Sequence, residues 1–336
     1  GVVLWSILTV LFTVLFAGAC IGSNLAFASA QAVNIALKTP THKTVGKDDS
    51  AVYYESDFSS VEELEAHDKE IAEQLTGEGA VLLKNDNNTL PLAAGSKVST
   101  LSHSSVDVVT CGTGSADIDT SKAPTWKQAL EDVGFDVNPV LWDFYTTGAG
   151  ASYKKEVPSI TGQGRFAANE APQSAYTQAE FDSMAQYNDA AVVVIGRSGS
   201  ESVDLPTEYL SFTQEERNLI QMATERFDKV ILLLNVTNPI NMTELSQYDI
   251  DAVLWVGALG QEGAYAIGEA LNGTVNPRGH LVDTWAADAA SAPAAANLGD
   301  YTITNSDVFA GNKYIVYAEG VYVGYRYYET RYEDAV

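Results

Sequence analysis

Three segments of this chain have a continuous apolar run at their centre, and each run is bounded by polar or glycine-containing sequence. They are "AAVVVIG" at 190–196, "KVILLLN" at 229–235 and "DAVLWVG" at 251–257. A strand that is apolar at every position is buried on both faces, as in a parallel sheet covered by helices. Segments with apolar residues at helical spacing alternate with these strands. We therefore predict an α/β fold, with a mostly parallel sheet and helices on both faces, that is, a three-layer α/β/α sandwich.

Capping patterns predict where several of the helices begin. In each case a Ser or Thr is followed three residues later by a Glu, which is the capping-box pattern. These pairs are Ser60 and Glu63, Thr177 and Glu180, and Thr213 and Glu216. Ahead of the three apolar segments, "AVLLK" (80–84) is predicted to be a further buried strand, and "NDNN" (85–88) the turn that follows it.

Polar, glycine-containing loops follow four of the predicted strands. They read "CGTGSAD", "GRSGSESVD", "NVTNPINM" and "GALGQEG". In an open parallel sheet, ligands bind beyond the carboxyl ends of the strands, so a functional site is expected where these loops gather. The second loop places Glu201 and Asp204 just beyond a buried strand, where a carboxyl group can act as a proton donor. From their spacing alone, both acids also fit ordinary loop residues or helix caps.

The composition argues against two classes of function. The chain has 44 acidic and 19 basic residues and a formal net charge of −25, which argues against a nucleic-acid partner. Four scattered histidines and two cysteines provide no metal-ligand spacing, so no metal site is expected. The "CGTGSAD" loop lacks both the dinucleotide fingerprint and the phosphate-loop ending.

The first thirty residues form a separate segment. Residues 2–22 carry no charge over roughly twenty positions, which is enough to cross a bilayer. Ala-x-Ala patterns end at Ala28 and Ala30 and suit a signal-peptidase site. An apolar N-terminal helix at 1–30 is expected to serve as a membrane anchor or as a cleaved signal peptide, with a lipid-modified Cys20 as a third reading and a buried core helix as a fourth. The first three readings place the rest of the chain outside the cytoplasm, either secreted or anchored to the membrane.

Three regions are expected along the chain. Residues 31–58 are polar and are predicted to be a linker or extended arm, and residues 59–336 to be the sandwich domain. Within that domain, residues 140–175 show weak periodicity and are expected to be an insertion or a long loop.

The stretch "EGAVLLKNDNNTLPL" (78–92) resembles the entry motif of the α/β-sandwich domain of glycoside hydrolase family 3, the β-glucosidase family. Other segments that resemble the family follow in order: "VTCGTGSADI", "NVTNPINM", "GQEGAYAIGEALNGTVNPRGHLVDTWA" and "AEGVYVGYRYYET". Together they cover roughly residues 60–332. The resemblance implies hydrolysis of terminal β-D-glucosyl residues with retention of configuration, which requires two carboxylates and no metal or organic cofactor.

The resemblance also implies roles for individual residues. "GSESVD" is similar to the family's Glu-Gly-x-Asp motif, which implies the general acid/base role for Glu201 and a loop-stabilising role for Asp204. Ser202 stands where the family has Gly. Arg197 also matches family members and is expected to orient Asp204.

The nucleophile of the family is an Asp in a separate barrel domain of about 250 residues, usually within Ser-Asp-Trp, and no such motif occurs here. We therefore expect the sandwich-first arrangement, in which a barrel downstream completes the site. The alternatives are a non-catalytic domain that binds a carbohydrate or a partner, and a stand-alone hydrolase with a different site. Neither a nucleophile elbow nor a Ser-His-Asp constellation supports the latter.

Overall fold

The computed structural model describes residues 1–28, 56–159, 161–201, 203–299 and 301–331. The chain divides into two compact units, Gly1–Ser59 and Ser60–Val336. The described part of the first unit is mainly helix α1 (Val2–Ala28), and its Val2–Leu25 portion is long and apolar enough to cross a membrane. Most of the linker predicted at 31–58 lies outside the described residues.

The second unit is built on a six-stranded sheet in the order β1-β8-β7-β6-β2-β3. All neighbouring strands run parallel except β1, which pairs antiparallel with β8. Every residue of the two central strands β6 and β7 is buried. The strands are β1 (Val81–Asn85), β2 (Lys97–Leu101), β3 (Asp136–Val137), β6 (Ala190–Arg197), β7 (Val230–Val236) and β8 (Ala252–Trp255).

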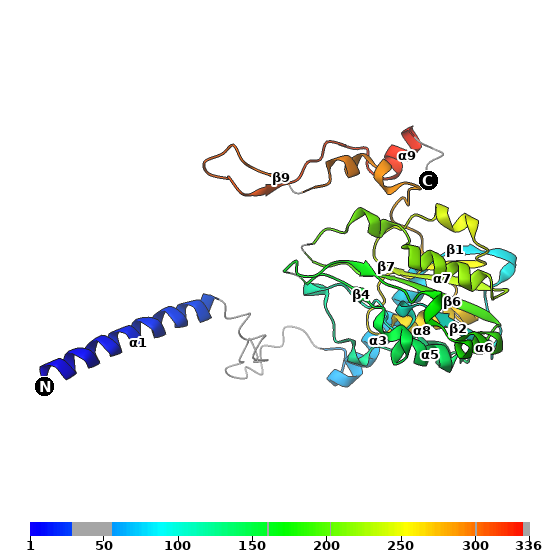
Figure 1. Cartoon of the computed structure of the whole chain (residues 1–336), viewed down its shortest axis with the longest axis horizontal. Coiled ribbons are helices and arrows are strands. Elements are labelled where there is room, and N and C mark those ends of the chain that lie inside the picture. The colour runs from blue at the N-terminus through cyan, green and yellow to red at the C-terminus, as the bar shows by residue number, and fades with distance from the viewer. Residues whose placement is uncertain (29–55, 160, 202, 300, 332–336) are drawn as a thin grey trace. The chain divides into compact units, whose positions relative to one another are not determined.

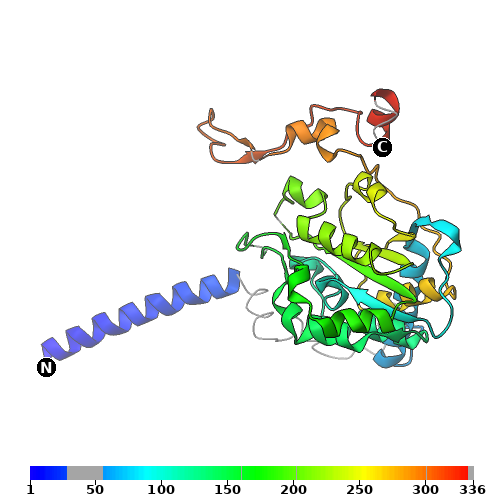
Figure 2. The same ribbon diagram turned by 45° about the vertical axis from the view of Figure 1, so that its right-hand side comes forward.

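Helices cover both faces of this sheet (Figure 1). Buried residues of α4 and α8 pack against Val192, Val194 and Leu233 on one face. Those of α5, α6 and α7 pack against Val193, Ile195 and Leu232 on the other. Figure 2, a second view, shows the same layers. The fold predicted from the sequence is confirmed. The helices are α3 (Val61–Gly79), α4 (Trp126–Asp132), α5 (Pro139–Thr146), α6 (Gln178–Gln186), α7 (Gln214–Thr224), α8 (Gly263–Asn272) and α9 (Tyr325–Arg331).

The caps that the sequence predicted are formed. Thr177 and Thr213 each make a complete capping box with the Glu three residues later, and Ser60 accepts a hydrogen bond from the backbone N–H of Glu63. These bonds satisfy amide groups that a helix leaves unpaired at its start, so the predicted starts agree with the structure.

Strand β1 differs from the expectation of a buried strand. It lies at the edge of the sheet and pairs only with β8, so Val81 is buried while Leu82 is 37% exposed. The "NDNN" turn that follows is confirmed: Asn87 and Asn88 both have φ of 54°, the left-handed conformation that Asn tolerates well.

Helix α3 also departs from its sequence pattern. Its apolar residues at helical spacing, Val61 and Leu75 among them, are exposed. The helix packs through a small residue instead: a Cβ placed on Gly77 would lie 3.6 Å from Ala266 Cβ of α8 and only 2.9 Å from Val275 Cγ1 in the segment after α8. Close packing at glycine therefore decides which face of α3 is covered.

The segment 140–175 is not simply a loop. It begins within α5, whose Leu141 and Phe144 belong to the core, and continues through a hairpin of β4 (Lys155–Glu156) and β5 (Ala167–Ala168). Phe144 stacks on Tyr176 just after the other end of the segment, and both rings belong to the core cluster that includes Val193 and Ile195 of the sheet. The weak hydrophobic periodicity of this segment gave no sign that it contributes to the core.

After α8, the described residues form short elements only. Strands β9 (Tyr301–Thr302) and β10 (Lys313–Tyr314) make a second hairpin. Short 3-10 helices fill many connections, among them η2 (His103–Ser105), η3 (Gly114–Ala116) and η7 (Thr207–Leu210).

Candidate active site at the carboxyl edge of the sheet

Glu201 lies in a tight turn just beyond the carboxyl end of β6. The turn is closed by a hydrogen bond from the backbone N–H of Val203 to Ser200 O, at 3.3 Å. The Glu201 side chain is exposed, and its Oε2 accepts two hydrogen bonds from Ser115, one from the backbone N–H at 2.7 Å and one from Oγ at 3.0 Å. Donors aimed at a carboxylate favour its charged form, and the Ser115 hydrogen bonds lower the pKa of Glu201. Glu201 is therefore a fixed, ionised carboxylate on an open surface.

Ser115 belongs to the loop that leaves β2, residues 106–119, and this loop is anchored from below by Asn235. The Asn235 side chain is fully buried near the end of β7. It accepts a hydrogen bond from Val109 N at 2.7 Å and donates to Val109 O at 3.0 Å and to Gly257 O at 2.6 Å. One amide thus ties together the loops after β2 and β8. Sequence reasoning missed Asn235, although a polar residue inside an otherwise apolar strand was a usable signal.

The loop after β2 also approaches the loop after β6 very closely. A Cβ at Gly112 would lie 3.4 Å from the carbonyl oxygen of Gly199. The two backbones are thus in contact here, which brings Ser115 within reach of Glu201.

Arg197 does not play the role expected of it. Its side chain is completely buried at the end of β6, and its guanidinium donates to both oxygens of Glu216, at 2.5 and 2.6 Å. The guanidinium also lies 4.7 Å from the centroid of the Tyr209 ring. Arg197 therefore anchors the base of the loop to the first turn of α7. The hydrogen bonds that the structure gives it within the described residues do not include one to Asp204, which is exposed further along the same loop.

A buried group of titratable side chains lies next to this anchor. Glu170 is 4% exposed and accepts a hydrogen bond from the backbone N–H of His103 at 2.8 Å. Burial raises the pKa of Glu170 to about 8. Burial, followed by the charge of Lys155, lowers the pKa of His103 to about 4. Lys155 donates to Asp107 Oδ2 at 2.6 Å. Their burial makes these side chains structural supports of the edge rather than groups that meet a ligand.

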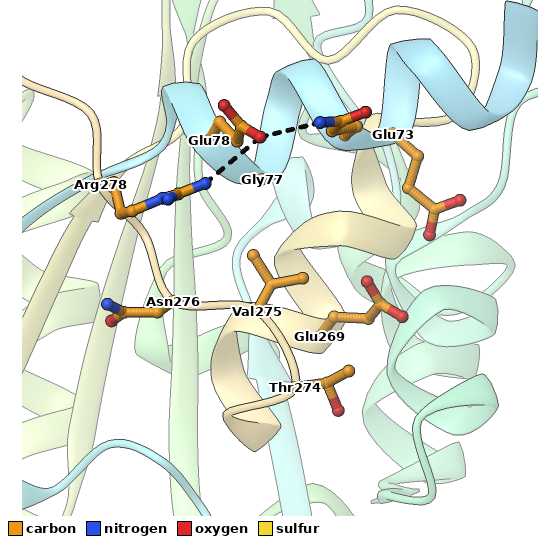
Figure 3. Close-up of a pocket in the computed structure, with 9 residues that line it drawn as sticks. Glu73, Gly77, Glu78, Glu269, Thr274, Val275, Asn276 and Arg278 are labelled. Carbon is orange, nitrogen blue, oxygen red and sulfur yellow. Dashed lines mark hydrogen bonds and ion pairs between the residues drawn. The ribbon is translucent and has the colours of Figure 1, made fainter.

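A separate pocket of about 390 Å³ lies between α3, the end of α8 and the segment after it. Glu78 accepts a hydrogen bond from Gln74 and forms an ion pair with Arg278. Figure 3 shows Glu73 and Glu269 facing the same space. Burial, and then the neighbouring charge of Glu269, raises the pKa of Glu73. The residues that line this pocket include none from the loops that carry Ser115 and Glu201, so the pocket plays no part in the site described above.

Comparison with known proteins identifies the family. The model of the glycosyl hydrolase family 3 C-terminal domain matches residues 80–325. A β-glucosidase of Ruminococcus albus is 30% identical over 278 residues, which are 80% of this chain and 27% of that protein. The chain thus spans about three tenths of the length of the curated relatives it matches, 31% in the case of β-glucosidase A of Butyrivibrio fibrisolvens.

Solved structures agree with this assignment. A β-glucosidase from Paenibacillus barengoltzii superposes with a TM-score of 0.66 at 31% identity, over 80% of this chain and 28% of that one. β-Glucosidase 3B from Thermotoga neapolitana, solved in complex with glucose, gives a TM-score of 0.66 at 28% identity, over 80% of this chain and 36% of that one. The sheet, the loops at its carboxyl edge and the matched sequence agree, and the chain belongs to the glycosyl hydrolase family 3 C-terminal domain family.

Proposed function

We propose that this chain is the acid/base-bearing domain of a retaining, exo-acting β-glucosidase that removes terminal non-reducing β-D-glucosyl residues. The observation that carries the proposal is the position of Glu201, an exposed carboxylate in a tight turn at the carboxyl edge of the sheet. Family membership and β-glucosidase relatives support the same reading.

Glu201 performs two proton transfers in this scheme. In the first step the protonated form of Glu201, which the Ser115 hydrogen bonds disfavour, gives its proton to the glycosidic oxygen as the bond to the anomeric carbon breaks, while a second carboxylate forms the glycosyl-enzyme ester. In the next step the ionised Glu201 removes a proton from water, and the water oxygen displaces the ester and releases glucose. The second carboxylate is the Asp of a barrel domain that we propose as the partner. The chemistry uses two carboxylates and calls for no metal or organic cofactor.

The remaining loop residues support Glu201. The ion pair of Arg197 with Glu216 fixes the start of the loop to α7. We assign Asp204, exposed on the same loop, a role in stabilising the loop conformation.

Exposed apolar side chains in the C-terminal part of the chain support a partner domain. Val308, Ile315 and Tyr317 are 80%, 71% and 75% exposed. Further large apolar side chains between residues 309 and 325 are exposed as well, and such a concentration in one segment is typical of a surface that a partner covers. A barrel domain of the same enzyme is the partner we propose. With α1 as a membrane anchor or secretion signal, the enzyme acts outside the cytoplasm.

The test is hydrolysis of aryl β-glucosides by the complete protein encoded by the gene and by the 336-residue chain alone. We expect the complete protein to be active because it carries both carboxylates. The chain alone should be inactive because it carries only the acid/base. In the complete protein, Glu201→Gln is expected to lower kcat by roughly 10²–10⁴-fold for a leaving group that needs protonation. Measured as kcat/KM, which reports the first step alone, the loss should be smaller for a dinitrophenyl glucoside, whose leaving group departs unaided. Glu208→Gln, at a nearby exposed position, is the matched control.

Three outcomes contradict the proposal. Activity of the chain alone would require a complete site within these residues. Full activity of the Glu201→Gln protein on both substrates would remove Glu201 from the mechanism. Glucan binding without hydrolysis by the complete protein would favour a non-catalytic carbohydrate-binding domain.

A further inference from the structure

The loops after β2 and β6 are joined side by side by hydrogen bonds between their own residues. Ser198 Oγ donates to Cys111 O at 2.9 Å. The hydroxyls of Thr113 and Ser200 are 2.7 Å apart, and the same two residues form a parallel β-bridge. The two loops therefore hold a fixed register, which brings Ser115, two residues beyond Thr113, close to Glu201, the residue after Ser200.

The contact between Ser115 and Glu201 is asymmetric. Both donors of Ser115, its backbone N–H and its hydroxyl, reach Oε2 of Glu201. Among the hydrogen bonds of the described residues, none goes to Oε1. The two oxygens of this carboxylate, which would be equivalent in water, are made different by the protein.

We propose that Ser115 is the positioning residue of the acid/base: it holds Oε2 of Glu201 so that Oε1 is the oxygen that gives and takes the proton. An oxygen that accepts two hydrogen bonds is the less basic one, so a proton added to the carboxylate resides on the other. This inference rests on the proposed role of Glu201, and it adds which oxygen acts and which residue selects it.

The proton inventory of the reaction is consistent with this arrangement. As Glu201 acts as an acid, the bond between Oε1 and its proton breaks and the proton joins the departing oxygen. The negative charge left on the carboxylate is stabilised at Oε2 by the two donors of Ser115, which are already in place. When water attacks, Oε1 accepts its proton and the initial state is restored. A fixed Oε2 also limits rotation of the carboxyl group, so Oε1 keeps one direction through both steps.

The experiment follows the ionisation of Glu201 directly. The carboxyl carbon of Glu201 is titrated by ¹³C NMR in the 336-residue chain and in its Ser115→Ala and Ser115→Thr variants. We expect the pKa of Glu201 to be higher in Ser115→Ala, which loses the hydroxyl donor, and close to the original in Ser115→Thr, which keeps it. Ser121→Ala is the matched control, because Ser121 is an exposed serine of the next turn that binds Asp119 instead. The proposal is overturned if Glu201 titrates identically in the original chain and in Ser115→Ala.

A second readout separates this inference from the proposed function. In the complete protein, Ser115→Ala should lower kcat on a poor leaving group about tenfold, the effect of one hydrogen bond to a charged group, with KM unchanged. Rescue by Ser115→Thr supports positioning, whereas a change in KM alone, or an unchanged kcat beside a shifted pKa, overturns it. A shifted pKa in a complete protein that hydrolyses no glucoside contradicts the proposed function and leaves the oriented Glu201 carboxylate standing.

Discussion

Replacing Glu170 with glutamine removes a titratable group from the core while keeping its hydrogen-bond acceptor. Glu170 is buried, and its Oε2 accepts the backbone N–H of His103. The amide oxygen of glutamine can accept the same bond, and its NH₂ group resembles the hydroxyl of a protonated carboxyl group. Any difference in stability between the two proteins that depends on pH therefore reports the ionisation of Glu170.

The sign follows from the pKa values. Burial raises the pKa of Glu170 to about 8, from the value of 4.5 expected for an unfolded chain. The folded state thus keeps a proton that the unfolded state releases, so stability is full below pH 4.5 and falls as pH rises to 8. At about 1.36 kcal/mol per pKa unit, the total is about 5 kcal/mol, of which ~2 kcal/mol falls between pH 6.5 and 8.

The window above pH 6.5 is chosen because of His103. Burial and the charge of Lys155 lower its pKa to about 4 from 6.5, so the contribution of His103 rises from pH 4 to 6.5 and is constant above. Urea unfolding followed by the fluorescence of the buried Trp126 gives the free energy of unfolding at each pH. We expect Glu170→Gln to gain ~2 kcal/mol relative to the original chain between pH 6.5 and 8.

The control is Glu225→Gln, an exposed position, for which the difference should not change with pH. If the difference between Glu170→Gln and the original chain is the same at pH 6.5 and pH 8, the carboxyl group is already ionised in the folded state. The account of a neutral, buried Glu170 would then be wrong.

Two further predictions concern the supports of the site. Arg197→Met should lower the free energy of unfolding by ~3–5 kcal/mol because it leaves Glu216 buried without its partner. The double variant Arg197→Met with Glu216→Leu should lose much less. Equal losses of the two variants in urea unfolding would contradict this reasoning. Asn235→Ala should lower the free energy of unfolding by ~3 kcal/mol, because three hydrogen bonds to backbone groups are lost. It should also speed hydrogen exchange of the Val109 amide. Unchanged exchange would show that other contacts hold the loop.

The sequence predicted the central sheet because its signals are local and strong. Strands β6 and β7 are apolar at nearly every position, and a strand covered on both faces has few other compositions. Strand β1 was predicted to be buried on the same evidence, and the prediction was wrong. Five apolar or long-stemmed residues do not reveal whether a strand has one neighbour or two, and β1 has one.

The same limit applies to the site. Glu201 could be singled out because glycine, serine and acidic residues after a buried strand mark the edge where ligands bind. Its partner Ser115 lies 86 positions earlier in the chain, so their contact depends on the pairing of β2 with β6. The expected contact between Arg197 and Asp204 failed for a related reason: a guanidinium at the end of a buried strand needs a buried carboxylate, and only the fold shows that Glu216 supplies it.

Glu216 shows how the edge is built so that Glu201 can remain exposed. The Glu216 carboxylate accepts a hydrogen bond from the backbone N–H of Thr213, the N-cap of α7, and another from the guanidinium of Arg197. Helix α7 and the end of β6 are thus fixed at one buried point, from which the loop emerges. A carboxylate meant for proton transfer needs an accessible oxygen and a rigid base. In the mechanism proposed above, the buried pair supplies the rigidity, Ser115 fixes one oxygen, and the other oxygen of Glu201 is the one that meets a substrate.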